Sequence, residues 1–189
     1  MDKLSRKLVA VCRADAKKFK GLVHRSDGCL PADKLFALLN IKHTEEDLIK
    51  MIEEQERLGY KRDEDTGKLW IYCYQGILDE YMSPNGPVER EKLYTKVVVD
   101  SKTGVVLYHS TREEHKESIL LNGLGMDKKR DIHLWGEDNK KKGKKGSDCL
   151  IEVNASLLVL ENPEVVVWVA GNGVHLIETN IAPKYLCFL

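Results

Sequence analysis

The hydrophobic pattern of this chain changes its period about halfway along. In the first 60 residues, apolar side chains recur at steps of three and four, which is typical of amphipathic helices. From residue 97 onward they gather in short runs rich in valine and isoleucine, which are typical of strands. Between these regions, residues 78–96 are polar and hold two of the five prolines. The pattern therefore predicts a domain at 1–77, a linker at 78–96 and a domain at 97–189.

The first domain is expected to be mainly helical. Apolar spacing predicts helices over 4–19 and 33–39. Thr44 is expected to be the N-cap of a third helix, which continues through Leu58 and stops at Gly59. Two β-like runs around the turn sequence DEDTG then predict a hairpin. Three helices followed by a hairpin are typical of a winged helix.

The second domain is expected to be an α+β domain with a mainly antiparallel sheet. Two helices are predicted, at 113–121, closed by Asn122 and Gly123, and at 155–160. The predicted strands are 97–99, 105–109, 132–134, 149–153, 165–169, 174–177 and 184–188.

Composition excludes several classes of protein. The chain is 42% hydrophobic, which suffices for an ordinary core and argues against a disordered protein. No apolar run approaches the roughly 20 residues that span a bilayer, and the first residues lack the pattern of a signal peptide. We therefore expect a cytoplasmic protein, with the nucleus as the alternative location, and no membrane partner. We also expect a monomer.

The five cysteines do not suggest a metal site or a disulfide framework. They are odd in number and widely spaced, and no two form a CxxC pair. Each has apolar neighbours in the sequence, so each is interpreted as a small buried hydrophobic residue. No metal is expected.

Charge is balanced overall but unevenly distributed. The chain has 30 Lys and Arg against 30 Asp and Glu. The first 25 residues and the segment 128–145 are basic, whereas 45–56 is acidic. The two basic clusters could form one positive face for a phosphate-bearing partner. The alternative for the lysine-rich part of 128–145 is a solvated loop, and the sequence leaves both open.

Common catalytic motifs are missing from the sequence. It contains no P-loop, no GxGxxG after a strand, no HExxH and no GxSxG. Polar residues instead stand at predicted strand ends: His109 to Thr111, His133, and the turn of Asn172 and Gly173. A strand-end histidine is often structural, but two of them beside a Gly-Asn-Gly turn also suit a ligand site.

Several motifs resemble the RNA 2'-phosphotransferase family of the KptA type. In that family the typical order is YHGT, a GL..M segment, HIHL or HVHL, a strand ending in VDA, then NGVWL and IPPKYL. This chain has LYHSTREEHKESILLNGLGM at 107–126, DIHL at 131–134, CLIEVNAS at 149–156 and NGVHLIETNIAPKYL at 172–186. In the first half, 12–39 resembles the family's helix-turn-helix, and WIYCYQGI at 70–77 resembles WIRANQGHS.

The resemblance implies a winged-helix lobe for RNA and an ADP-ribosyltransferase-like lobe for NAD, which acts as co-substrate. The implied reaction removes a 2'-phosphate from RNA, with tRNA as one expected class, by transferring it to the ADP-ribose of NAD with release of nicotinamide. Cofactor binding is implied for His109, Ser110, Thr111, His133, Asn172, Gly173 and Val174. Val174 stands where protein-modifying ADP-ribosyltransferases have a glutamate.

The resemblance also implies a set of cations that hold the RNA phosphate. The roles expected from it are catalysis by Arg13 and Arg130 and phosphate or RNA binding by Arg13, Arg57, Lys128, Lys129 and Lys145. Arginine suits this task because its planar fork matches phosphate oxygens.

This cationic set departs from the family pattern at several positions. A second arginine would fall on Gly59 if Tyr60 matches the family's aromatic residue, and only a shift of two residues lets Arg57 serve. The family also has histidines where this chain has Ala14, Ile77 and Asp131.

Three hypotheses follow. The first is an active NAD-dependent RNA 2'-phosphotransferase, and the retained NAD-side residues favour it slightly. The second is a family member that has lost the reaction and binds RNA or a protein. The third, a sequence-specific DNA reader, is disfavoured because its recognition helix at 44–57 would present many acids to the phosphate backbone.

Overall fold

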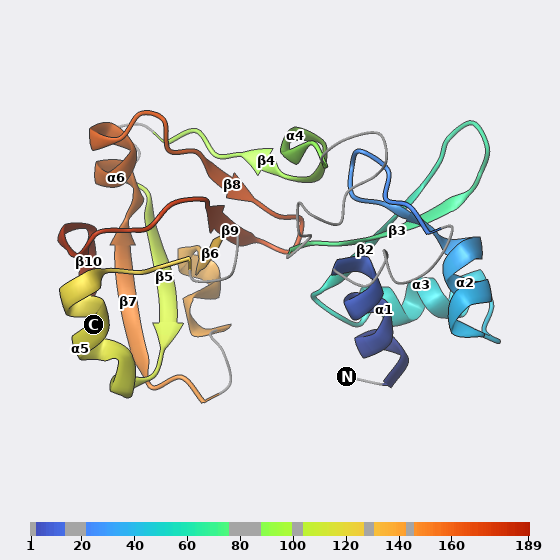
Figure 1. The fold of residues 1–189 in the computed structure, drawn as a ribbon, viewed down its shortest axis with the longest axis horizontal. Coiled ribbons are helices and arrows are strands. Elements are labelled where there is room, and N and C mark those ends of the chain that lie inside the picture. The colour runs from blue at the N-terminus through green and yellow to red at the C-terminus, as the bar shows by residue number, and fades with distance from the viewer. Residues whose placement is uncertain (1–2, 14–21, 76–87, 100–103, 127–130, 143–145) are drawn as a thin grey trace. The chain divides into compact units, whose positions relative to one another are not determined.

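The structure is a computed structural model that describes residues 3–13, 22–75, 88–99, 104–126, 131–142 and 146–189. Contacts divide the chain into two compact units, Met1–Leu93 and Tyr94–Leu189. Figure 1 shows the helices and strands of both units. The expected linker 78–96 is described only from residue 88, where it contains the helix α4 (Arg90–Leu93) and the strand β4 (Thr95–Lys96).

The first unit combines helices with a small antiparallel sheet. Its helices are α1 (Lys3–Arg13), α2 (Ala32–Leu39), α3 (Glu45–Glu53) and α4. Its strands are β1 (Leu30–Pro31), β2 (Leu58–Arg62) and β3 (Leu69–Cys73), which pair in the order β1-β3-β2. The predicted order of helices followed by a hairpin is confirmed, and the winged-helix assignment stays a prediction.

The core of this unit lies between the helices and one face of the sheet. Along β3, the side chains of Leu69, Ile71 and Cys73 are buried, whereas those of Trp70 and Tyr72 are half-buried. This alternation is the period of two of a strand with one face on the core. Residues of α1, α2 and α3 complete the cluster, among them Leu8, Leu35 and Leu48.

The ends of two helices differ from the predicted ranges or lie outside the described residues. The third helix was expected to run to Leu58, which is wrong, because α3 ends at Glu53 and Leu58 begins β2. Leu58 lies on β2 and is buried in the core. A longer helix would bury this leucine equally well. The apolar spacing alone therefore could not distinguish a helix from a strand at this position. The first helix is described to Arg13, and 14–19 lie outside the described residues.

The second unit is an α+β structure built on a seven-stranded antiparallel sheet. The strands beyond β4 are β5 (Val106–Thr111), β6 (Ile132–Trp135), β7 (Cys149–Asn154), β8 (Val167–Val169), β9 (Val174–Ile177) and β10 (Leu186–Phe188). Their order is β10-β7-β5-β6-β9-β8-β4. This confirms the predicted fold class, and the ADP-ribosyltransferase-like assignment stays a prediction.

The helices of the second unit are short. They are α5 (Lys116–Asn122), which follows the 3-10 turn η3 (Glu113–His115), and α6 (Ala155–Glu161). Two further 3-10 turns are η4 (Glu137–Lys142) and η5 (Pro183–Tyr185). Ile119 of α5 and Leu158 of α6 join the buried core with Leu107, Leu134 and Ile151 of the sheet. Figure 1 shows α5 and α6 beside the end of the sheet that holds β5, β7 and β10.

Three local predictions for the second unit are wrong. The strand expected at 97–99 lies two residues earlier, as β4, and Val97 adds one hydrogen bond from its N–H to the carbonyl of Val167. The strand expected at 184–188 begins only at Leu186, because Pro183 starts a 3-10 turn. Cys187 is exposed on β10, although the other four cysteines are buried as expected.

Within the described residues, no helix has the length and apolar composition that crossing a membrane requires.

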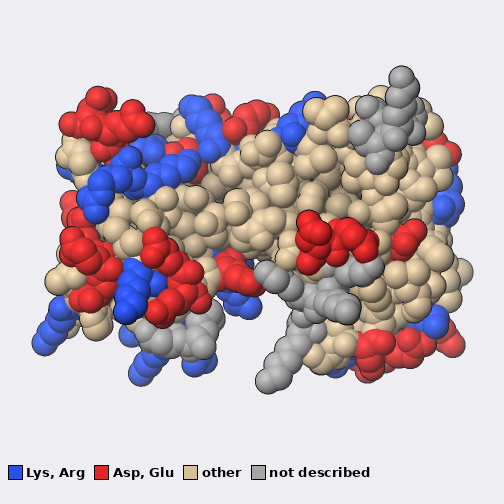
Figure 2. Space-filling view, turned by 180° about the vertical axis from the view of Figure 1, so that it is seen from behind, with Lys and Arg blue, Asp and Glu red and all other residues tan. Residues whose placement is uncertain are grey.

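On the face shown in Figure 2, basic side chains are interspersed with acidic ones. The predicted basic clusters are described only in part, since 14–21, 127–130 and 143–145 lie outside the described residues. The proposal of a single positive face therefore stays a prediction.

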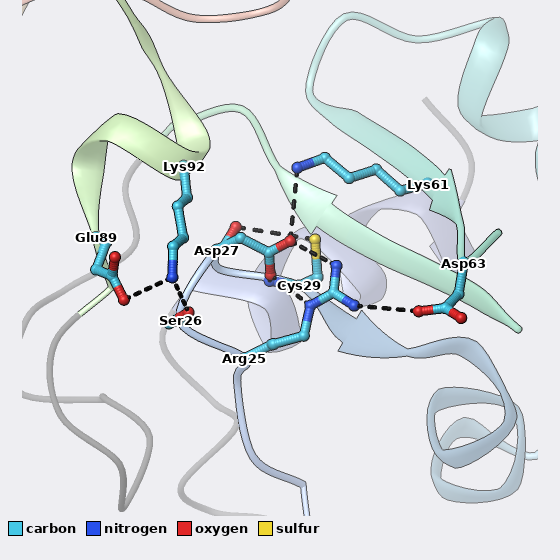
Figure 3. Close-up of polar contacts among 8 residues, drawn as sticks. All are labelled: Arg25, Ser26, Asp27, Cys29, Lys61, Asp63, Glu89 and Lys92. Carbon is cyan, nitrogen blue, oxygen red and sulfur yellow. Dashed lines mark hydrogen bonds and ion pairs between the residues drawn. The ribbon is translucent and has the colours of Figure 1, made fainter. Parts of the chain in front are cut away.

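A cluster of charged side chains lies on the first unit around Asp27 (Figure 3). The carboxylate of Asp27 accepts two hydrogen bonds from the guanidinium of Arg25, at 2.9 and 2.6 Å, and forms an ion pair with Lys61 at 3.5 Å. Asp63 faces Arg25 at 3.9 Å. Burial alone would raise the pKa of Asp27, but the hydrogen bonds and charge of Arg25 lower that pKa to about 2.

Acid titration of Asp27 should be visible in the stability of the chain. The pKa of Asp27 is lower in the folded state than the ordinary value of about 3.9, so its contribution is complete above that value and disappears as the pH falls toward 2. We expect Asp27→Asn to lower the free energy of unfolding by about 1–2 kcal/mol at pH 7 and by less than half as much at pH 2.5. Urea denaturation at pH 7, 4 and 2.5 measures this. The same substitution at exposed Asp65 is the control, and an equal loss at all three pH values for Asp27→Asn would contradict the expectation.

The predicted N-cap of α3 is confirmed. The hydroxyl of Thr44 accepts a hydrogen bond from the N–H of Asp47 at 3.1 Å, and the Asp47 carboxylate accepts one from the N–H of Thr44 at 3.2 Å. This reciprocal pair is a capping box, which satisfies backbone donors that the first turn of a helix leaves open.

We expect Thr44→Ala to lower the free energy of unfolding by about 1 kcal/mol, because it removes the side-chain half of this box. Thr44→Ser keeps the hydroxyl and should change stability little. Urea denaturation followed by far-UV circular dichroism compares the two variants, and equal losses would show that the hydroxyl does not act as a cap.

Candidate functional site

A polar pocket of about 460 Å³ lies in the second unit where β5 ends and β6 begins. His109, Ser110 and Thr111 come from β5, and Ile132 and His133 from β6. Leu107 of β5 and Leu134 of β6 are buried in the core, whereas His109 and His133 are half-buried. On β6, the period of two places His133 on the face opposite the buried Leu134. On β5, His109 lies on the same face as Leu107, two residues nearer the strand end that borders the pocket.

His109 is held by the backbone of the neighbouring strand. Its Nδ1 lies 3.2 Å from the carbonyl oxygen of His133. Because a carbonyl only accepts, Nδ1 carries the proton in this contact, and in the neutral ring Nε2 is then the acceptor. This contact therefore orients the ring of His109 and favours the tautomer with the proton on Nδ1.

The wall opposite the strands depends on Gly123. Gly123 closes α5 with a φ of 78°, a conformation that favours glycine, and a Cβ at this position would collide with the carbonyl oxygen of Ile181. The tight approach lets Leu124 pair with Ile181 in an isolated β-bridge. The chain then turns so that Leu124, Gly125 and Met126 line the pocket.

Further polar groups line the same pocket. They are Arg112 and His115, which are exposed, the buried Asp131, and Ser147 with its neighbour Gly146. Arg112, His115 and Ser147 were not predicted from the sequence. Arg112 and His115 follow β5 directly in the chain, and this position beyond a strand end was the signal that could have identified them.

The turn predicted to bind the cofactor lies elsewhere on the sheet. Asn172 and Gly173 form the turn between β8 and β9, where the side chain of Asn172 accepts a hydrogen bond from the N–H of Val174 at 3.3 Å. Val174 is only 1% exposed and pairs with Trp135, at the end of β6 away from the pocket. The structure thus groups His109, Ser110, Thr111 and His133 and leaves these three residues outside the pocket lining. Their role in binding stays a prediction.

Two of the predicted phosphate-binding residues lie near the same strand end of the first unit. The Nε of Arg13, the last residue of α1, donates a hydrogen bond to the carbonyl of Gln75 at 3.0 Å. The carbonyl of Arg57 accepts one from the N–H of Tyr74 at 3.1 Å. Both arginines therefore lie at the carboxyl end of β3. Six other positions singled out in the sequence lie outside the described residues: Ala14, Ile77, Lys128, Lys129, Arg130 and Lys145.

The thiols next to Arg13 are not exposed nucleophiles. Cys12 and Cys73 are completely buried, and their hydrogen bond, together with burial, raises the pKa of Cys12. Among the described residues, no group of three or more His, Cys, Asp or Glu side chains is arranged to hold a metal ion.

The comparison with protein families decides the relationship of the chain. The model of the RNA 2'-phosphotransferase, Tpt1 / KptA family matches residues 1–179. The chain belongs to this family. No curated protein matches it. The resemblance seen in the motifs is thereby confirmed over nearly the whole chain. Membership in the Tpt1/KptA family implies RNA 2'-phosphotransferase activity on RNA that carries a 2'-phosphate.

Gly59 stands where one alignment of the motifs expects a family arginine. In the structure Gly59 is buried opposite Tyr72, and a Cβ there would lie 2.5 Å from the ring carbon Cζ of Tyr72. A larger side chain at this position must displace the Tyr72 ring. The exposed Arg57, two residues earlier, is therefore better placed than residue 59 to supply a cation at this end of β3.

We expect Gly59→Ala to lower the free energy of unfolding by about 1–3 kcal/mol, because the added methyl group overpacks the Tyr72 ring. In a Tyr72→Ala background the same substitution should cost little, since the obstructing ring is gone. A double-mutant cycle from urea denaturation measures the coupling. Additive effects of the two substitutions would contradict the contact.

Proposed function

We propose that this chain is an NAD-dependent RNA 2'-phosphotransferase. Its reaction would transfer the 2'-phosphate of an RNA, with tRNA as one candidate, to the ADP-ribose of NAD and release nicotinamide. The observation that carries the proposal is the pocket that His109, Ser110, Thr111 and His133 line from two paired strands. Family membership supports the same reaction class.

The chemistry of the pocket fits part of a dinucleotide. The hydroxyls of Ser110 and Thr111 and the imidazoles of His109 and His133 offer donors and acceptors for ribose hydroxyls and a carboxamide. Leu124 and Ile132 add apolar surface for a flat ring. Bound NAD would supply the anomeric carbon that accepts the RNA phosphate as its bond to nicotinamide breaks. The role of the protein is then to orient this group rather than to provide a nucleophile.

His109 is suited to a fixed binding role. Its Nδ1 lies against the carbonyl of His133, which holds the ring in place, and in the neutral ring with its proton on Nδ1 the Nε2 is the acceptor. A ligand hydroxyl that donates to this nitrogen would be held at a defined position. Such preorganisation lowers the entropy that binding would otherwise cost.

Arg13 and Arg57 are the described candidates for the RNA phosphate. Their position at one end of β3 would let two guanidinium groups share phosphate oxygens, each with a planar pair of donors. We assign the remaining cationic roles to Lys128, Lys129, Arg130 and Lys145, as the family resemblance implies. Positive charge at these positions would stabilise the charge that develops on the reacting phosphate.

A second candidate function is an RNA- or protein-binding module that has lost the reaction. The observation that favours it is Gly59, which cannot hold an arginine without displacing Tyr72. Ala14, Ile77 and Asp131 depart from the family pattern in the same sense. A charge-assisted contact is worth about 1.5–3 kcal/mol, so losing several would slow the reaction by orders of magnitude.

One experiment separates these candidates. Purified protein is titrated with NAD in a calorimeter, a 2'-phosphorylated oligoribonucleotide is added, and nicotinamide release is assayed. Binding with release supports the transferase. RNA binding without release, with an affinity that falls steeply as salt rises, supports the module, because phosphate contacts release counterions.

The pocket itself is tested by Ser110→Leu. A leucine side chain overpacks the pocket at a cost of about 1–3 kcal/mol, so we expect NAD binding to weaken roughly tenfold to a hundredfold while the fold is kept. Ser118→Leu makes the same change at an exposed position of α5 outside the pocket and should leave NAD binding unchanged. Calorimetry compares the two variants, and equal NAD affinity in both would place the NAD site elsewhere.

A further inference from the structure

The outer face of the sheet in the first unit carries a row of aromatic rings. Trp70 and Tyr72 lie on β3, and Tyr74 follows its last residue. All three side chains are half-buried, whereas the alternate residues Ile71 and Cys73 are completely buried in the core. A solvent-facing strand face normally carries polar side chains, so three aromatic rings in succession on this face need an explanation.

The rings lie close together on the sheet. The ring centroids of Tyr72 and Tyr74 are 5.4 Å apart, with an angle of 84° between the ring planes. The ring of Tyr72 reaches across to β2, where Gly59 has no side chain to obstruct it. From Trp70 to Tyr74 the row spans roughly 13 Å at about 3.3 Å per residue. This length accommodates at least two nucleobases, which stack at about 3.4 Å.

Cations lie over two of these rings. The guanidinium carbon of Arg25 lies 4.4 Å from the ring centroid of Trp70, and the Nζ of Lys61 lies 5.2 Å from that of Tyr72. Asp27 holds both cations, as Figure 3 shows. Because Asp27 and Asp63 largely balance their charge, these two cations order the rings rather than create a strongly positive surface.

The row ends beside the two arginines that the proposed function assigns to the RNA. Tyr74 donates its N–H to the carbonyl of Arg57, and Arg13 binds the carbonyl of the next residue, Gln75. Aromatic rings beside cations are the elements with which proteins bind single-stranded nucleic acid, since bases stack on the rings and phosphates meet the cations.

We propose that this face, formed by Trp70, Tyr72 and Tyr74, binds unpaired bases of the RNA substrate by stacking. The proposal rests on the proposed function for its choice of RNA as the ligand. Stacking depends on the π-face that every base has, so the face selects single-stranded over double-stranded RNA and discriminates little between sequences. Arg13 and Arg57 then engage the phosphates of the same strand.

The test uses matched substitutions that either keep or remove a ring. Tyr72→Phe and Tyr74→Phe keep the stacking surface, whereas Tyr72→Leu and Tyr74→Leu replace it with an aliphatic side chain. The probes are a labelled hexauridine RNA without 2'-phosphate and an abasic ribose-phosphate hexamer of the same length. Fluorescence anisotropy at one salt concentration measures their affinity for the full chain, and circular dichroism checks that each variant is folded.

We expect the unsubstituted chain to bind hexauridine at least tenfold more tightly than the abasic hexamer. Each leucine variant should lose roughly tenfold in affinity for hexauridine and little for the abasic hexamer, and each phenylalanine variant should retain the preference. The proposal is overturned if the chain does not distinguish the two probes, if it binds neither, or if the leucine and phenylalanine variants behave alike.

Nicotinamide release is measured separately in the same preparations. A chain that stacks hexauridine but releases no nicotinamide from a 2'-phosphorylated oligonucleotide would support the aromatic face and contradict the transferase. A chain that releases nicotinamide equally in all four variants and shows no preference for hexauridine would support the transferase and contradict the aromatic face.

Discussion

The hydrogen-bonded ladder between β5 and β7 is the interaction on which the second unit depends. It pairs all six residues of β5, from Val106 opposite Asn154 to Thr111 opposite Cys149. The opposite edge of β5 pairs with β6, so β5 is a central strand. Its backbone is thereby fixed along its whole length, and its last three residues line the pocket without the freedom of a loop.

In the first unit, β3 has the corresponding role. It is the middle strand of its sheet, one face buries Ile71 and Cys73 against the helices, and the other carries the aromatic row. Both arginines assigned to the RNA are tied to the backbone just beyond its end. A rigid strand thus carries the proposed ligand groups in each unit, and each strand is held by pairing on both edges.

Side-chain packing explains the departure from the family pattern at Gly59. Gly59 has no side chain, and the ring of Tyr72 occupies the space that one would fill. The position therefore contributes to an aromatic surface instead of a cationic one. If the proposed function is correct, affinity for RNA has moved in part from charge toward stacking, which depends less on salt.

Much of the architecture could be predicted from local sequence. The N-cap at Thr44, the termination of α5 at Gly123 and the strands β6 and β9 each depend on residues close together in the chain, so they were predicted. The position of Leu58 in a strand could not be predicted, because a buried leucine is equally compatible with a helix and with a strand. Nor could the sequence show that Arg112 and His115 share a pocket with Asp131, since the intervening chain must first fold.

The sequence by itself determined the family, the α+β class and the strand-borne histidines, because these depend on motif order and on the period of apolar residues. Only the tertiary structure decided which of the selected residues meet. It grouped His109, Ser110, Thr111 and His133, and placed Asn172, Gly173 and Val174 in a turn outside the pocket lining. It also ordered the aromatic row beside Arg13 and Arg57. The physical reason is that strand order and register come from long-range hydrogen bonds and core packing, and no local pattern in the chain specifies them.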